Sequence, residues 1–160
     1  AERCTCALFR AALTRQDVRP RSRRRHPLSP LRPHPHFDDH GTLDWHVSWK
    51  SALAAARAGQ KLVFVEFGRE ACGQCRSLVQ SVVPRPDIAP LLQQNFVALA
   101  SDCDDAEDEV LALADKLEDA QMLPFVLVAD ANGRFLGGSS GALGPAALRQ
   151  LLEAALAKKN

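Results

Sequence analysis

Two cysteines stand at the point where an apolar run gives way to a helical pattern. Leu62–Phe67 is short, continuous and rich in β-branched and aromatic residues, which is typical of a buried strand. Cys72–Val83 has the pattern of a helix, and two prolines follow that would end it. The chain therefore passes from a buried strand to a helix just where Cys72 and Cys75 occur. Such a junction indicates a sheet that is covered by helices.

The same alternation of strands and helices continues along the chain. Asn132-Gly133 separates two of the expected strands and predicts a hairpin with a type I′ turn. Together the segments predict an α/β fold with a mixed central sheet of about four strands and helices on both faces. The other expected helices lie at residues 48–58 and 88–94, from about 106, and from 145, and the other expected strands at 96–100, 124–129 and 134–137.

The first 42 residues differ in composition from the rest. Arg19–Pro35 contains five of the ten prolines and a run of three arginines. A segment of this kind buries too little apolar surface to offset the entropy lost on ordering. We therefore expect residues 1–42 to form a disordered basic extension and residues 43–160 to form the folded domain. An organelle-targeting segment is the alternative for residues 1–42, because they are rich in Arg and poor in acidic residues.

Composition narrows the possible functions. The 160 residues suit one domain with an extension, and the chain lacks the ~18–20 apolar residues in a row that a membrane helix requires. Residues 37–160 are net acidic, which disfavours nucleic acid as a partner. All five His lie at or before His46, which disfavours a Cys–His catalytic pair inside the domain. We expect a soluble monomer without a membrane span, intracellular rather than secreted.

Cys72 and Cys75 are three positions apart at the expected start of a helix, close enough for a disulfide. The free N–H groups and the dipole at a helix start stabilise a thiolate on the first cysteine. Cys72 is then the exposed nucleophile, and Cys75, one turn further on, is the shielded thiol. A zinc site needs four ligands, and Cys103 is the only other cysteine in the domain. We therefore expect no metal and no bound cofactor.

The segment Phe64-Val65-Glu66-Phe67-Gly68-Arg69-Glu70-Ala71-Cys72-Gly73-Gln74-Cys75 resembles the active-site segment of the thioredoxin superfamily. Met122-Leu123-Pro124-Phe125 resembles the cis-proline loop of that superfamily. The resemblance covers residues 45–159 and implies a thioredoxin fold. With a Trp-bearing helix directly before the active-site strand, the sequence resembles one branch of this superfamily. That branch includes small thioredoxin-like proteins of the endoplasmic reticulum and the C-terminal domain of the bacterial reductant DsbD.

The resemblance implies a thiol–disulfide oxidoreductase that acts on protein or peptide thiols and disulfides and exchanges electrons with a redox partner. Cys72 would attack a substrate disulfide, and Cys75 would resolve the mixed disulfide. Glu66 stands where thioredoxins have a buried acid. Because burial favours the neutral form of a carboxyl group, Glu66 would take the Cys75 proton as that thiol attacks. The sequence leaves open whether Glu66 points toward the cysteines or toward solvent.

The resemblance also implies a substrate-binding surface. Pro124 would follow a cis peptide bond and face the cysteines, and the Leu123 backbone would pair with a bound peptide as an added strand. Gly73 and Gln74 would contact the substrate from between the cysteines. Ala71 replaces the usual Trp and Gln74 the usual Pro, which makes a strongly reducing role doubtful.

Two other functions remain open. In the first, the domain is a binding module in which the Cys72–Cys75 disulfide is structural. In the second, Cys72, Cys75 and Cys103 carry a metal ion. Acidic neighbours make Cys103 a weak nucleophile, and a half-buried structural role is the simpler interpretation. Arg69 and Arg76 are expected to favour the thiolate of the cysteine pair, whereas Glu70 is expected to oppose it.

Overall fold

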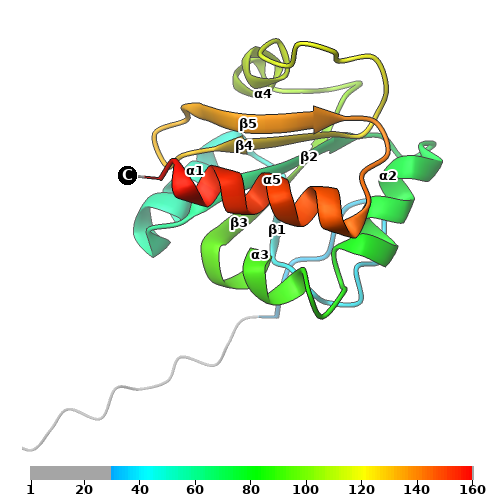
Figure 1. Ribbon diagram of the computed structural model, residues 1–160, viewed down its shortest axis with the longest axis horizontal. Coiled ribbons are helices and arrows are strands. Elements are labelled where there is room, and N and C mark those ends of the chain that lie inside the picture. The colour runs from blue at the N-terminus through cyan, green and yellow to red at the C-terminus, as the bar shows by residue number, and fades with distance from the viewer. Residues whose placement is uncertain (1–29, 160) are drawn as a thin grey trace, which may run out of the picture.

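A five-stranded mixed sheet forms the centre of the protein (Figure 1). The computed structural model describes residues 30–159. The strand order is β1-β3-β2-β4-β5, with β1, β3 and β2 parallel to one another and β4 and β5 each antiparallel to its neighbour. The strands are β1 (Trp45–His46), β2 (Leu62–Gly68), β3 (Phe96–Asp102), β4 (Phe125–Ala129) and β5 (Phe135–Ser140).

Helices cover both faces of the sheet, and each face has its own apolar cluster. Helices α1 and α4 pack on one face, while α2, the π-helical turn η1, α3 and α5 pack on the other. In Figure 1, α5 crosses the near face and α2 lies at one end of the sheet. The helices are α1 (Trp49–Gly59), α2 (Gly73–Ser77), η1 (Leu78–Val82), α3 (Ala89–Asn95), α4 (Asp108–Ala114) and α5 (Pro145–Ala157).

The observed architecture confirms the expected α/β fold with helices on both faces, and it adds one strand to the expected number. The additional strand, β1, has two residues and pairs with β3, with Trp45 opposite Ala98. A two-residue strand is too short for a period of two to be visible in the sequence. Within residues 30–159, every helix is too short or too polar to cross a bilayer.

Residues 30–42, which we name the N-terminal segment, are packed against the domain, contrary to our expectation of disorder. His34, Phe37 and Asp39 are buried, and Phe37 belongs to the apolar cluster under α2 and α5. The Asp39 carboxylate accepts hydrogen bonds from the Leu43 N–H and the Trp45 indole N–H, both at 2.9 Å. The expectation of disorder was wrong here because composition does not reveal a few buried anchors. The expectation for residues 1–29 lies outside the described residues.

Two local predictions need correction. The expected helix Cys72–Val83 is divided, because α2 ends at Ser77 and the chain continues as the π-helical turn η1. The hairpin between β4 and β5 is present, but of Asn132 and Gly133 only Gly133 has a positive φ, at 86°. A type I′ turn needs positive φ at both positions. The turn runs instead from Asp130 to Gly133, whose N–H donates to the Asp130 carbonyl at 3.0 Å.

Candidate active site

Cys72 lies immediately before α2, in extended backbone, and its sulfur accepts a hydrogen bond from the Cys75 N–H at 3.1 Å. Cys72 and Cys75 form a disulfide with a Cα–Cα distance of 5.2 Å, which is usual for such bonds. Cys75 is fully buried, whereas Cys72 is half-buried. The Cys75 N–H that donates to Cys72 Sγ stabilises a thiolate there once the disulfide is reduced.

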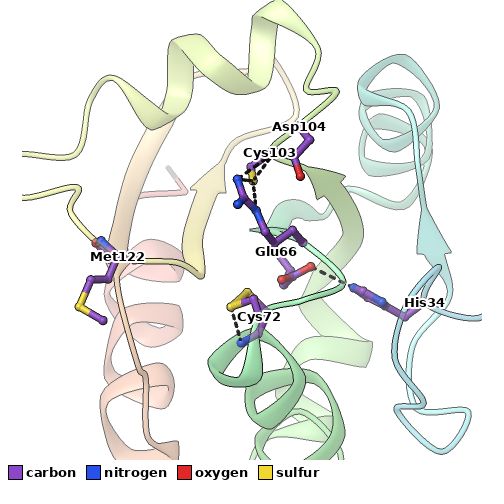
Figure 2. The surroundings of a disulfide bond; sticks show 9 residues. His34, Glu66, Cys72, Cys103, Asp104 and Met122 are labelled. Atoms are coloured by element: carbon purple, nitrogen blue, oxygen red, sulfur yellow. Dashed lines mark hydrogen bonds and ion pairs between the residues drawn. A yellow bond between two sulfur atoms is a disulfide. The ribbon is translucent and has the colours of Figure 1, made fainter.

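Glu66 lies on β2 and points toward the disulfide. Its neighbours Val65 and Phe67 belong to the apolar cluster on the opposite face of the sheet, so Glu66 faces the side that carries α2. A Cβ placed on Gly68 would lie under 3.0 Å from both Glu66 Oε1 and Cys75 Sγ. The carboxyl oxygen and the sulfur are therefore neighbours across a glycine. Figure 2 shows the Glu66 carboxyl group between the disulfide and His34.

The two oxygens of Glu66 have different surroundings. Glu66 is 2% exposed, and its Oε2 lies 2.9 Å from His34 Nε2. Its Oε1 is buried and has no hydrogen-bond partner among residues 30–159. Leaving a buried polar atom unpaired costs about 1–3 kcal/mol, and such atoms occur at sites with a chemical role. The sequence could not settle where Glu66 points, and the structure turns it to the cysteines.

Leu123 and Pro124 lie in the loop that enters β4. The peptide bond between them is cis, as expected, and Pro124 is buried while Leu123 is half-buried. Met122, which precedes them, is 57% exposed. Figure 2 shows Met122 at the same end of the sheet as the disulfide. Ser140 Oγ accepts hydrogen bonds from the N–H groups of Gln121 and Met122 at 3.1 and 3.2 Å, which fixes the loop.

Gly73 and Gln74 differ in their surroundings. Gly73 is exposed, and apart from its chain neighbours and its own helix backbone no atom lies within 4 Å of the position that a Cβ would take. Gln74 lines a groove between α2 and the start of α5, whose other side includes Leu143 and Pro145. Its buried Oε1 has no hydrogen-bond partner in the described part of the chain. An unpaired acceptor in a groove beside the disulfide is available to an N–H donor of a bound molecule.

Cys103 is half-buried and is not part of a disulfide within the described range. Arg69 donates to its sulfur through Nε and Nη2 at 3.2 and 3.1 Å, and Nη2 also donates to Asp104 at 2.9 Å. Asp102, Cys103 and Asp104 place their ligand atoms within 4.8 Å of one another. The guanidinium of Arg69 already supplies the positive charge there, which disfavours a metal cation.

The two arginines near the cysteine pair are engaged elsewhere. We expected Arg69 and Arg76 to favour the thiolate, but Arg69 is bound to Cys103 and Asp104. The Arg76 guanidinium lies over the ring of Phe37, 5.9 Å from its centre. For the described residues, the backbone N–H of Cys75 is therefore the donor that the structure places on Cys72.

Three residues of this region were missed in the sequence. His34 was assigned to the disordered extension, and Met122 and Ser140 were given no role. A sequence pattern that could have indicated a packed His34 is the aromatic run His34-Pro35-His36-Phe37, together with Trp45 further along. Aromatic residues within a Pro-rich segment indicate packing. In the structure the His34 ring stacks on Phe37 at 5.2 Å and meets the edge of Trp45 at 4.7 Å.

Comparison with known proteins places this arrangement in a family. A family model described as thioredoxin-like matches residues 44–131. A search of curated proteins gave no significant match. Many solved structures match the chain, and three that share its fold are 24% identical to it or less.

A thioredoxin from Thermus thermophilus is 24% identical, with a TM-score of 0.61 over 74% of this chain and 91% of its own. A DsbH oxidoreductase is 16% identical, with a TM-score of 0.53 over 72% of this chain and 85% of its own. A poplar thioredoxin h is 19% identical, with a TM-score of 0.52 over 70% and 96%. Because the family model covers more than half of the sequence, the chain belongs to the thioredoxin-like family of the thioredoxin superfamily.

Proposed function

We propose that the protein is a thiol–disulfide oxidoreductase that exchanges the Cys72–Cys75 dithiol and disulfide with protein or peptide substrates. One observation carries this proposal: a half-buried sulfur before α2 accepts an N–H hydrogen bond and pairs with a fully buried second sulfur. Membership in the thioredoxin-like family supports it, and so does the fold shared with a thioredoxin and an oxidoreductase. The electron pair moves between sulfur atoms, so the reaction needs no bound cofactor.

In the reductive direction, the Cys72 thiolate attacks one sulfur of a substrate disulfide. A bond forms between Cys72 Sγ and that sulfur, the substrate S–S bond breaks, and the second substrate sulfur leaves as a thiolate. The partial exposure of Cys72 allows this attack, whereas the burial of Cys75 keeps that thiol from the substrate. The product is a mixed disulfide at Cys72.

The second step releases the substrate. The Cys75 thiol loses its proton to Glu66 Oε1, and its sulfur attacks Cys72 Sγ. The bond between Cys72 and the substrate breaks as the Cys72–Cys75 disulfide forms, and the substrate sulfur leaves as a thiolate. Glu66 suits this role because Oε1 is buried, unpaired among the described residues and next to Cys75. A carboxylate oxygen that lies beside a thiol and has no other hydrogen-bond partner is placed to act as its general base.

The substrate is proposed to bind along the loop before β4. A peptide that adds as a strand would pair with the backbone of Leu123 beside Pro124, and Gly73 and Gln74 would contact it from the other side. The exposed Met122 side chain supplies apolar area on the same loop. We also propose that the protein acts as a monomer and exchanges electrons with a separate redox partner. The resemblance of this chain to the branch that includes small endoplasmic-reticulum proteins and the DsbD C-terminal domain stays a prediction.

Replacement of Cys72 tests this function. Cys72→Ser is expected to lower the rate of insulin disulfide reduction by dithiothreitol to that of the buffer, because the attacking sulfur is lost. Cys103→Ser is the matched control, since it removes a half-buried thiol outside the pair, and it is expected to keep the wild-type rate. Wild-type turnover by Cys72→Ser would refute the mechanism. An inert wild-type protein would leave the fold as a binding module with a structural disulfide.

A further inference from the structure

We propose that His34 is a positioning residue for this exchange reaction. It holds the Glu66 carboxyl group so that Oε1, the oxygen that takes the proton, faces Cys75. The inference rests on the proposed function and adds a residue from the N-terminal segment to its machinery. Both ring nitrogens of His34 make hydrogen-bond contacts, and the His34 and Glu66 side chains are both buried.

The contacts of Nδ1 determine which nitrogen of His34 carries the proton. The backbone N–H groups of His36 and Phe37 donate to Nδ1 at 3.1 and 3.2 Å. A nitrogen that accepts hydrogen bonds cannot also carry a hydrogen in the ring plane. The proton therefore lies on Nε2, which is 2.9 Å from Glu66 Oε2. His34 is a neutral donor to Glu66, fixed in this tautomer by the backbone of its own segment.

The tautomer of His34 assigns separate roles to the two oxygens of Glu66. Oε2 accepts the Nε2–H hydrogen bond, so a proton that arrives at the carboxylate is held on Oε1. Oε1 is the atom without a partner among residues 30–159, and it lies beside Gly68 and Cys75 Sγ. Without His34, the carboxyl group could rotate or take its proton on either oxygen. With His34, the oxygen that faces the sulfur is the one that stays free.

The surroundings of His34 keep this arrangement rigid. His34 is 5% exposed and lies against Phe37 and Trp45. The titratable and charged groups near it come from four elements. Glu66 belongs to β2 and contacts the ring, and Asp102 of β3 lies 3.5 Å from His36. Arg76 of α2 covers Phe37, and the N-terminal segment itself contributes His36 and the buried Asp39.

His34 does not change which bonds form and break, or where the proton goes, when Cys75 attacks the mixed disulfide. The Cys75 proton moves to Glu66 Oε1, and the Cys75–Cys72 bond forms as the bond from Cys72 to the substrate breaks. The substrate sulfur leaves with that electron pair and takes a proton from solvent. The pair of cysteines is oxidised and the substrate disulfide is reduced. His34 keeps its Nε2 proton throughout, so it acts through Glu66 and exchanges nothing itself.

Two substitutions separate positioning from folding. In His34→Asn, the Asn oxygen is placed to accept from the N–H groups of His36 and Phe37, as Asx turns do, but the side chain is too short to reach Glu66. In His34→Gln, the amide N–H reaches the place of Nε2 and donates to Glu66, while the bonds at Nδ1 are lost. His40→Asn is the matched control, because His40 is exposed on the same segment and has a positive φ that Asn tolerates.

The readout uses the reduced full chain and 5,5′-dithiobis(2-nitrobenzoate) in stopped flow. Attack by Cys72 releases the first thionitrobenzoate, and attack by Cys75 on the mixed disulfide releases the second. We expect His34→Asn to slow the second release about 10-fold or more and to leave the first unchanged. This slowing is a part of the 10²–10⁴-fold rate contribution that is typical of general acid–base catalysis. We expect His34→Gln and His40→Asn to stay within about 3-fold of wild type for both releases.

An unchanged second release in His34→Asn, or equal slowing of both releases, would overturn the role of His34. Slowing in His34→Gln as large as in His34→Asn would overturn it as well. Nitrogen NMR of the wild-type ring is an independent test, since His34 must show the Nε2–H tautomer at the pH of the assay. If the wild-type chain itself gives no second release, the proposed oxidoreductase function fails, and this result differs from any that concerns His34 alone.

Discussion

Gly68 is the residue on which the geometry of the site depends most closely. It ends β2 between the Glu66 carboxyl group and the buried sulfur of Cys75, and a Cβ there would lie under 3.0 Å from both. Its φ is not positive, so the position requires glycine for space and not for backbone conformation. The neighbouring sulfur and carboxyl group keep their contact only if this position has no side chain.

Replacement of Gly68 by alanine tests this reading. We expect Gly68→Ala to lower the free energy of unfolding by about 1–3 kcal/mol, because the methyl group overlaps Glu66 and Cys75. Gly73→Ala is the matched control, since the space at Gly73 is open, and its effect is expected to stay within about 0.5 kcal/mol. Urea unfolding of the oxidised proteins measures both. Equal stability of the two variants would contradict the close packing at Gly68.

At the scale of elements, the N-terminal segment is attached to β1 by a cluster of polar groups. Arg32 donates to both oxygens of Asp44 at 2.9 and 3.0 Å, and its Nη2 lies 2.7 Å from His46 Nε2. Burial, and then the charge of Arg32, hold the pKa of His46 below its ordinary value. The hydrogen bond from Arg32 is the largest of the causes that lower the pKa of Asp44.

These shifts predict how stability depends on pH. The folded state resists protonation of His46, whereas the unfolded chain takes up this proton near pH 6.5. The contribution of His46 is therefore fully present above pH 6.5 and is lost as pH falls through that value toward the lower pKa of the folded state. Asp44 contributes in the same direction, and its part is lost as pH falls below 3.8. We expect a loss of about 1 kcal/mol or less from each group.

Thermal unfolding at a series of pH values measures this dependence. His46→Gln, which does not titrate, is expected to flatten the fall in Tm that begins near pH 6.5. His40→Asn is the control that keeps the wild-type slope, because His40 is exposed. A slope in His46→Gln equal to that of wild type would assign the loss of stability to other groups.

The long elements with a continuous or periodic apolar pattern were predicted more accurately from the sequence than the short ones. Leu62–Phe67 and the helix from Pro145 were predicted well, because each has a continuous or periodic apolar pattern. Strand β1 was missed, since two residues held by pairing with β3 have no period of their own. The turn after β4 was predicted as the wrong type, because Asn132 has a negative φ and the Asp130 side chain organises the turn by accepting from the N–H groups of Asn132 and Arg134.

At the scale of the molecule, the site brings together three parts of the chain at one end of the sheet (Figure 2). They are the N-terminal segment with His34, the stretch from Glu66 to Cys75, and the loop with Met122. Glu66 and the cysteine pair are close in sequence, and their resemblance to a known motif predicted them together. His34 comes from a segment whose composition indicates disorder, and it reaches Glu66 only because Phe37 and Asp39 anchor that segment. Local sequence patterns could not predict the pairing of His34 and Glu66, which are 32 positions apart.

The proposed function requires Cys72 and Cys75 to act as one reversible redox couple. The most direct test is a redox equilibrium titration of the full chain in dithiothreitol and glutathione buffers, quenched with a thiol-reactive mass tag. We predict that both thiols titrate together in a two-electron transition with a midpoint between about −270 and −120 mV, the range of exchanging enzymes. A pair that never closes, or that closes below about −300 mV and resists exchange, would contradict the account.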